Sequence, residues 1–262
     1  DLNDVNMIDP FHLEAYGETT VNYNRDVEIF PVLNTIFEKI YGESPYKSPT
    51  DMGVNMAGNC ICDDDACREA SKQEIIRRYY AALNALVKGD ASDKEAQKIE
   101  LLMNMAGITV ADRAVAVKAL ERAKETNGPA AALQLEDGRI ITGKTTNLLG
   151  ASAALLLNVL KELAGLDHEL HIISPESIEP IQKLKVDYLK SKNPRLHTDE
   201  VLIALSASAA MNPDARLALS QLPKLDGCQA HTSVMLSDVD IKIFKKLGVQ
   251  LTCEAVYEHM IL

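Results

Sequence analysis

Residues 129–262 alternate short apolar runs with longer amphipathic segments, and this alternation constrains the fold more than any other feature of the chain. Two apolar runs, 131–136 and 139–143, flank Asp137-Gly138, a pair typical of the tight turn in a β-hairpin. The later pattern predicts strands at 171–173, 231–236 and 250–254, with helices at 148–164, 176–189, 198–212 and 239–247. Strands that alternate with helices form a sheet covered by helices. We therefore predict an α/β fold, in which a helical segment is followed by a three-layer α/β/α sandwich with a mixed sheet.

The residues before this region favour helices alone. Residues 59–128 contain two capping boxes, Ser71 with Glu74 and Thr109 with Asp112, in which side chains satisfy the free N–H groups of a helix start. Short connections between three predicted helices are typical of a small antiparallel bundle.

Residues 1–58 contain one predicted helix, from Pro31 to Gly42, and are otherwise loops with proline and glycine. The first residue is Asp1 rather than Met, so we interpret the chain as a fragment of a longer protein. We divide it into three parts: 1–58, the tail of a missing N-terminal domain with a connector; 59–128, a helical subdomain; and 129–262, the α/β sandwich domain.

Charge and composition exclude several classes of function. The 262 residues include 27 Lys and Arg against 38 Asp and Glu, which gives a net charge of −11. Such a chain has no basic surface to draw it onto nucleic acid, and it repels anionic membrane surfaces. No apolar run approaches the ~18 residues that span a bilayer. Five cysteines, an odd number, without a signal peptide indicate a reducing, cytoplasmic setting. We expect no nucleic-acid and no membrane partner.

Two patterns resemble cofactor sites, and each has a simpler interpretation. The segment Gly138-Arg-Ile-Ile-Thr-Gly-Lys-Thr145 matches the phosphate-loop pattern G-x-x-x-x-G-K-T. Its two isoleucines prefer extended backbone, whereas a phosphate loop curls its N–H groups around the anion, so we predict a hairpin strand. Cys60, Cys62 and Cys67 lie beside three aspartates, but their spacing matches no zinc template, and we predict no metal. The sequence identifies no cofactor.

The densest polar cluster, residues 183–200, is the candidate functional site. Five side chains stand out at a predicted helix end, a loop and the next helix start: Lys183, Lys185, Asn193, Arg195 and His197. Helix N-termini bind anions, and a guanidinium can hold a carboxylate or phosphate through two N–H groups. We expect the first four to bind an anion and His197 to transfer a proton. The alternative is a solvated loop before a helix capped by Thr198, with Arg195 paired to a carboxylate of the same fold.

His231, which opens a predicted strand, is a second catalytic candidate because α/β proteins bind ligands near strand ends. The alternative is a structural histidine inside the sheet. The sequence contains no H-E-x-x-H, no G-x-S-x-G and no dinucleotide-binding glycine fingerprint. It therefore gives no support to a zinc protease, an α/β-hydrolase or a dinucleotide dehydrogenase.

Several longer strings of residues are similar to one bacterial family. They lie at residues 4–12, 19–25, 48–56, 69–80 and 191–200, and the family is catalogued as domain of unknown function 1846. The resemblance covers nearly the whole chain. It implies the C-terminal half of a longer protein, whose other half contains a glycine-rich, phosphate-loop-like segment. It brings no catalytic residues to assign.

Residues 129–262 also resemble the cytidine-deaminase fold in their order of hairpin, helix and alternating strands. That family binds zinc through a His or Cys followed by Glu on one helix and a Pro-Cys-x-x-Cys on the next. Here residues 150–155 and 174–178 contain no such ligands. The resemblance therefore implies a shared topology without zinc deamination.

Two functions from different classes follow from these observations. The leading hypothesis is an enzyme half that binds a small anionic substrate or a nucleotide, with the missing N-terminal half completing the chemistry. The alternative is a non-catalytic module for oligomerisation or scaffolding. We expect a homo-oligomer.

Overall fold

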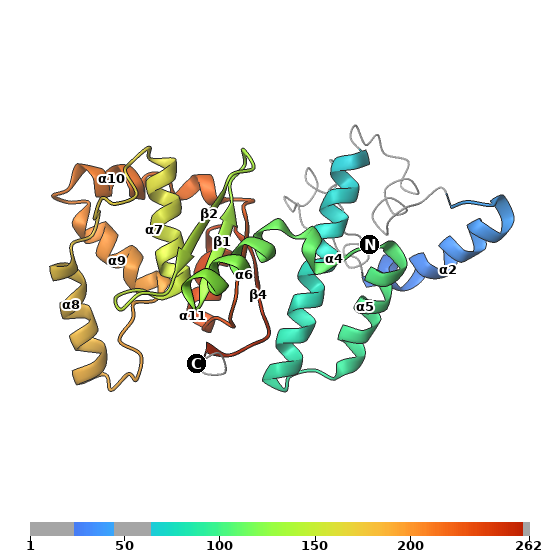
Figure 1. Ribbon diagram of the computed structural model, residues 1–262, viewed down its shortest axis with the longest axis horizontal. Coiled ribbons are helices and arrows are strands. Elements are labelled where there is room, and N and C mark those ends of the chain that lie inside the picture. The colour runs from blue at the N-terminus through green and yellow to red at the C-terminus, as the bar shows by residue number, and fades with distance from the viewer. Residues whose placement is uncertain (1–23, 45–63, 259–262) are drawn as a thin grey trace. The chain divides into compact units, whose positions relative to one another are not determined.

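The computed structural model describes residues 24–44 and 64–258 (Figure 1). The chain divides into two compact units, Asp1–Arg113 and Ala114–Leu262. Cys60 and Cys62 lie outside the described residues, so the absence of a metal at these cysteines stays a prediction.

The described residues of the first unit are mainly helical. They form α2 (Asn24–Tyr41), α4 (Asp64–Lys88), α5 (Asp93–Ala106) and the short 3₁₀ helix η1 (Val110–Asp112). Helix α4 packs on α5, and both contribute buried apolar side chains, among them Ile75, Ile76, Ile99 and Leu102. Gly107 ends α5 with a φ of 65°, a conformation that glycine adopts without a steric penalty.

Two of the predicted helix starts are wrong. Helix α2 begins at Asn24 rather than at Pro31, and α4 begins at Asp64, so that Ser71 lies inside the helix. A capping pattern marks a start only where the preceding residues do not themselves continue the helix. The aspartates at the N-terminal end of α4 favour an earlier start, because carboxylates are stabilised by the positive end of the helix dipole.

The other capping box is present but belongs to a different element. The Thr109 N–H donates to Asp112 Oδ2 at 2.7 Å, and both residues cap η1 rather than the following helix. The N–H of Arg113, which ends the first unit, continues the same turn by donating to the Val110 carbonyl at 3.2 Å.

The second unit is built on a mixed four-stranded sheet in the order β2-β1-β3-β4. The strands are β1 (Ala130–Gln134), β2 (Ile140–Lys144), β3 (Gln229–Thr232) and β4 (Gln250–Cys253). Strand β1 is antiparallel to β2 and β3, whereas β3 and β4 are parallel. The β1–β2 pairing confirms the hairpin predicted around Asp137-Gly138, with Gly138 at a φ of 85° in the turn.

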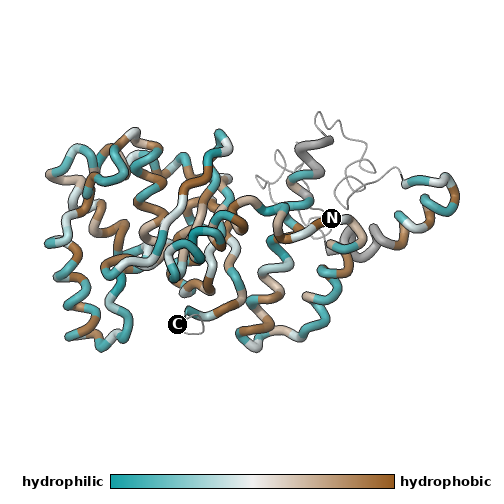
Figure 2. The backbone as a smooth tube through the Cα atoms, in the orientation of Figure 1, coloured by the Kyte–Doolittle hydropathy of each residue, from teal (hydrophilic) through white to brown (hydrophobic). Residues whose placement is uncertain are grey.

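Helices cover both faces of this sheet, as the α/β/α prediction requires (Figure 1). The helices are α6 (Ala114–Thr126), α7 (Ala151–Leu163), α8 (Pro175–Lys183), α9 (Thr198–Ser208), α10 (Pro213–Leu219) and α11 (Asp238–Lys246), with the π-helical turn η2 (Leu184–Tyr188) and the 3₁₀ turn η3 (Leu222–Leu225). Ala131 and Leu133 of β1 face the larger core, which includes residues of α7 and α9, whereas Ala132 faces α6. Figure 2 shows hydrophobic and hydrophilic residues alternating along the helices, as expected where one side of each is buried.

Helix α6 differs from its predicted place. The sequence suggests that it completes a bundle with the two preceding helices, but Val115 and Ala119 pack against Ala132 of β1. The boundary between the two compact units falls between Arg113 and Ala114, so α6 belongs to the second unit. An amphipathic pattern tells which face of a helix is buried but does not tell which element buries it.

The predicted strand at 171–173 is absent. Ile172 and Ile173 are buried, as their apolar character suggests, but residues 171–173 pair with no strand in the part of the chain that the structure describes. A short apolar run indicates burial, and only a neighbouring strand edge turns it into a strand.

Candidate functional site

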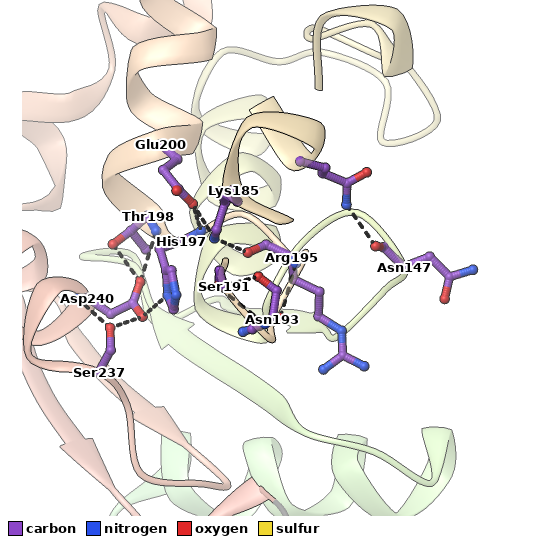
Figure 3. Close-up of polar contacts among 11 residues, drawn as sticks. Asn147, Lys185, Ser191, Asn193, Arg195, His197, Thr198, Glu200, Ser237 and Asp240 are labelled. Atoms are coloured by element: carbon purple, nitrogen blue, oxygen red, sulfur yellow. Dashed lines mark hydrogen bonds and ion pairs between the residues drawn. The ribbon is translucent and has the colours of Figure 1, made fainter. Parts of the chain in front are cut away.

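The polar cluster predicted from residues 183–200 lies where η2, the following loop and the start of α9 meet α11 (Figure 3). His197 is the central residue of this cluster. Its Nδ1 lies 2.9 Å from Oδ2 of Asp240, which comes from the first turn of α11. The imidazole is 33% exposed, whereas the Asp240 side chain is only 4% exposed. The hydrogen bond with Asp240 raises the pKa of His197 above its ordinary value, although burial acts in the opposite direction.

Asp240 connects the starts of two helices. Burial would raise the pKa of this carboxyl, but hydrogen bonds from His197, Thr198 and Ser237 outweigh it and lower the pKa to about 2. Asp240 Oδ1 accepts from the Thr198 N–H at 2.9 Å and from its hydroxyl at 2.8 Å, and Oδ2 accepts from Ser237 Oγ at 2.7 Å. The N-cap of α9 is therefore His197 rather than Thr198, and Asp240 supplies the acceptor that a helix start requires.

Lys185 is buried and already satisfied. Its Nζ donates to the Arg195 carbonyl at 2.6 Å and to Glu200 Oε2 at 2.8 Å. Glu200 Oε2 also accepts from the backbone N–H of His197 at 2.8 Å. This cation therefore holds the loop against α9, and its charge is compensated by a carboxylate of the same unit.

Arg195 and Asn193 also have partners within the second unit. The Arg195 guanidinium is 31% exposed and forms an ion pair with Glu258. Asn193 Oδ1 accepts from the Arg195 N–H at 3.1 Å, which closes a turn typical of asparagine. In Figure 3 the Arg195 side chain points away from His197 and Asp240. The structure thus brings His197 and Lys185 to one network but does not direct Arg195 toward it.

The remaining two candidates lie elsewhere. Lys183, the last residue of α8, is exposed. His231 lies in β3 opposite Ala132 and is fully buried on the side of the sheet that α6 covers. Its Nδ1 is 2.8 Å from Thr252 Oγ1, and its Nε2 is 3.3 Å from Glu254 Oε1. These contacts match the structural alternative for His231.

A cleft that sequence reasoning missed lies along β2, at the edge of the sheet. Its volume is about 640 Å³, within the usual range for small-molecule sites. Its walls come from the end of β2, the loop before α7, α7 itself and residues 168–178. Five basic or titratable nitrogen-bearing side chains line it: Arg122, Lys144, Lys161, His168 and His171. Among the lining residues, all of them in the described part of the chain, Glu169 supplies the single carboxylate.

Lys161 is the most buried cation of this cleft, with 8% exposure. Its Nζ donates to the backbone carbonyls of His168 and Leu170, which ties α7 to the segment on the far side of the cleft. Burial lowers the pKa of Lys161, and the charges of Glu169 and Asp167 offset this only in part. No carboxylate forms an ion pair with this ammonium within the residues that the structure describes.

The other nitrogen-bearing side chains that line the cleft differ in whether they have hydrogen-bond or ion-pair partners. Arg122 pairs with Glu125 through one terminal nitrogen, but its buried Nε–H finds no hydrogen-bond partner among the described residues. His168 Nε2 lies 2.8 Å from Glu162 Oε2. Lys144 is exposed at the end of β2. The cleft therefore retains donors that its own carboxylates do not satisfy.

The cleft and the predicted cluster share a wall. The loop residues 146–149 line the cleft, and the Leu196 N–H donates to the Leu148 carbonyl at 2.9 Å. The Gly150 N–H donates to the Leu196 carbonyl at 3.2 Å, so this loop is clamped to the residue that precedes His197. The G-x-x-x-x-G-K-T pattern is the one sequence motif that includes Lys144. It is typical of a phosphate loop, whereas Lys144 is the last residue of strand β2.

Within residues 24–44 and 64–258, no helix combines the length and apolar character needed to cross a membrane. The same residues contain no cluster of three or more His, Cys, Asp or Glu side chains arranged to hold a metal ion.

Comparison with known proteins gives a consistent result. Residues 111–262 match the family model "Domain of unknown function DUF1846, C-terminal", and residues 1–107 match "Domain of unknown function DUF1846, N-terminal". The expectation that only the C-terminal half of the family is represented is therefore corrected, because models of both parts match.

Several relatives are similar over nearly the whole chain. A UPF0371 protein of Corynebacterium urealyticum is 59% identical over 257 residues, which are 98% of this chain and 52% of the relative. Relatives from Corynebacterium efficiens and Streptococcus pneumoniae, also UPF0371 proteins, are 57% and 54% identical over 99% of the chain and 52% of their own length. The chain thus spans about half the length of the curated relatives it matches, and it belongs to the DUF1846 family.

Proposed function

We propose that the second unit binds a small anionic substrate in the cleft beside β2 and contributes this site to an enzyme. The observation behind the proposal is a local reversal of charge. The whole chain has a net charge of −11, yet the cleft is lined by Arg122, Lys144 and Lys161 against one carboxylate, Glu169. Cations held close together repel one another, and a bound anion removes this electrostatic cost. The low dielectric of cleft walls strengthens the attraction between the cations and such an anion.

This site is better supported than the predicted cluster at 183–200. Lys185 and Arg195 are paired with Glu200 and Glu258, so an anion would have to displace a carboxylate of the protein. His197 remains the proposed proton carrier, because Asp240 orients its ring while one third of the side chain stays exposed. The wall shared through Leu196 supports a connection between the two sites.

The chemistry of the complete protein is part of the same proposal. Because the chain spans about half of its relatives' length, groups outside it would complete the active site. The second unit would bind and orient the anion, and catalysis would depend on the rest of the longer protein.

Thermal unfolding with added anions tests the binding site. Inorganic phosphate, sulfate and acetate would be added in turn to the wild-type chain and to Lys144→Glu, with Lys245→Glu as the matched control. Lys245 is an exposed lysine of α11 that does not line the cleft. A ligand at about 100 times its Kd stabilises the folded state by about 2.7 kcal/mol.

We expect at least one anion to raise the Tm of the wild type and of Lys245→Glu but not of Lys144→Glu. The proposal is wrong if no anion raises the Tm of the wild type, or if Lys144→Glu responds as the wild type does.

An oligomeric scaffold is the second candidate, and α2 supplies the observation that favours it. Val32, Ile36 and Ile40 recur at intervals of four residues and are 60%, 43% and 64% exposed. Exposed apolar stripes of this kind are typical of helix–helix interfaces. Light scattering after size exclusion would test it: an oligomer that Ile40→Asp converts to a monomer supports the scaffold, whereas a wild-type monomer contradicts it.

A further inference from the structure

The cleft beside β2 has two chemically different walls, and together they restrict the kind of anion that fits. Aliphatic side chains form one part of the lining: Leu148, Leu149, Leu157, Leu170, Ile172, Ile173 and Ile178. The polar part comes from β2, α6 and α7: Arg122, Thr142, Lys144, Asn158 and Lys161. A small inorganic ion would use only the second set and would leave the accessible members of the aliphatic lining, Leu148, Leu149 and Leu170, in contact with water.

Lys161 contributes an ammonium group to the polar part of the lining. An ammonium has three N–H donors, and two of them are accounted for by the carbonyls of His168 and Leu170. The third is not used by any residue that the structure describes. Since the side chain is buried, an acceptor placed at this donor would interact more strongly than one on an exposed lysine.

The free edge of the sheet supplies a second kind of donor. The Leu135 N–H donates to the Arg139 carbonyl, and the Thr145 N–H donates to the Pro129 carbonyl. Because hydrogen bonding alternates along an antiparallel pair, the backbone groups of Thr142 and Lys144 point away from β1. Asn158 Nδ2 satisfies the Thr142 carbonyl at 2.9 Å, while the Lys144 N–H lies at the open edge beside the cleft.

A nucleotide fits this lining poorly. None of the lining residues, all of them described, is Phe, Tyr or Trp, so a base would have no aromatic partner on which to stack. Glu169 supplies the single carboxylate of the lining, the group that could accept from both hydroxyls of a ribose at once. Aliphatic side chains instead match a saturated carbon chain.

We propose that the ligand of this cleft is an amphipathic acid, with a carboxylate or phosphate head group at Lys144 and Lys161 and an aliphatic body of several carbons against the leucine and isoleucine wall. This inference rests on the proposed anion site and specifies its substrate class. A ligand of this kind uses both walls at once.

Isothermal titration of matched ligand pairs on the full chain tests the inference. Hexanoate is compared with acetate, hexyl phosphate with inorganic phosphate, and hexan-1-ol and hexylamine serve as uncharged and cationic controls. Burial of the extra methylene groups is expected to make each hexyl anion bind at least about 10-fold more tightly than its short partner. The alcohol and the amine are expected to bind at least about 10-fold more weakly than hexanoate.

Two variants separate the walls. Lys144→Ala is expected to weaken both hexyl anions, and Leu170→Asn is expected to weaken hexyl phosphate while leaving inorganic phosphate unchanged. Because Leu170 is partly exposed, this change is compatible with folding. Lys161→Met, which keeps the volume of the side chain, is a further test of the head-group site, with Tm measured to confirm that the variant folds.

The outcomes distinguish this inference from the proposed function. If phosphate and hexyl phosphate bind equally well, or if ATP binds more tightly than hexyl phosphate, the amphipathic ligand is wrong although the anion site stands. If hexan-1-ol binds as tightly as hexanoate, the head-group assignment is wrong. If no anion binds at all, the proposed function fails with it.

Discussion

Asp240 is a buried carboxylate that holds together the starts of two helices, α9 and α11. It accepts hydrogen bonds from Thr198 and His197 at the start of α9 and from Ser237, the N-cap of α11. These donors explain why its pKa is low in spite of burial, and they make this network a structural tie as well as a support for His197.

Asp240→Asn is expected to lower the free energy of unfolding by about 3 kcal/mol near neutral pH, because the network loses its buried charge and an amide N–H replaces an acceptor. Urea denaturation measures the loss. Ser237→Ala, which removes one donor and the cap of α11, gives the scale of a single contact and should cost about 1 kcal/mol. If the two variants were equally stable, Asp240 would not have the central role assigned to it.

The same carboxylate gives a defined pH dependence. Its pKa is about 2 in the folded protein against 3.8 in its ordinary state, so its contribution to stability is complete above about pH 4. The contribution, about 2 kcal/mol, disappears as the pH falls through the folded pKa. The difference in stability between wild type and Asp240→Asn should therefore shrink in acid.

The stability that His197 contributes depends on pH in the opposite direction. Its pKa is raised above 6.5, so the stability that its protonated ring contributes is present below that pH and is lost as the pH rises through the folded pKa. His197→Gln should destabilise the protein more at about pH 5.5 than at about pH 9. Denaturant titrations of the variant and of the wild type at both pH values measure the loss in free energy of unfolding. An equal loss at the two pH values would show that the contact with Asp240 does not favour the protonated ring.

Among the elements, the β1–β2 hairpin and α7 are linked through one glycine. A Cβ on Gly143 would lie 2.3 Å from the backbone nitrogen of Leu155, so α7 packs directly on the backbone of β2. This close approach explains why residue 143 is a glycine. The phosphate-loop pattern would instead assign that glycine to anion binding. It also fixes α7, and with it Asn158 and Lys161, beside the edge of the sheet.

Gly143→Ala is therefore expected to destabilise the protein by about 1–3 kcal/mol, because the helix must move away from the strand. Gly128→Ala is the matched control: its nearest neighbour would be an ordinary contact at 3.9 Å, and its backbone is not in the left-handed region. Thermal unfolding of both variants tests the difference. A Gly143→Ala protein as stable as the control would mean that α7 does not contact β2 so closely.

At the scale of the whole molecule, the second unit possesses its own core. The larger cluster of buried side chains lies between the sheet and the helices from α7 to α11, and the smaller one lies between the sheet and α6. All members of both clusters belong to residues 114–262.

A fragment of residues 114–262 should consequently fold by itself, whereas a fragment that starts at residue 129, the boundary suggested by the sequence pattern, lacks α6 and exposes Ala132 and Ile140. Cooperative melting by circular dichroism and dispersed amide resonances would identify the folded fragment. Equal stability of the two fragments would show that α6 is not part of this unit's core.

The candidate site was predictable only in part. His197 and Lys185 were found because they lie close together in a polar segment, and the structure joins them in one network. Arg195 was equally conspicuous, but its partner Glu258 is 63 residues away, and no local pattern indicates that pairing. The cleft was missed because its three cations come from α6, β2 and α7, which are far apart in the sequence and each carry an ordinary pattern.

Features that depend on neighbours along the chain are predictable from the sequence: the turn at Asp137-Gly138, the helix end at Gly107, and the helix–strand alternation with its α/β class. These follow from backbone sterics and from the spacing of apolar residues, which act over a few positions. Long-range packing instead specifies that α6 covers the sheet, that Ile172 and Ile173 pair with no described strand, and that Asp240 accepts the hydrogen bonds at the start of α9. Each of these depends on which surfaces meet in space, and an apolar stripe or a free N–H group specifies that it needs a partner without specifying which one.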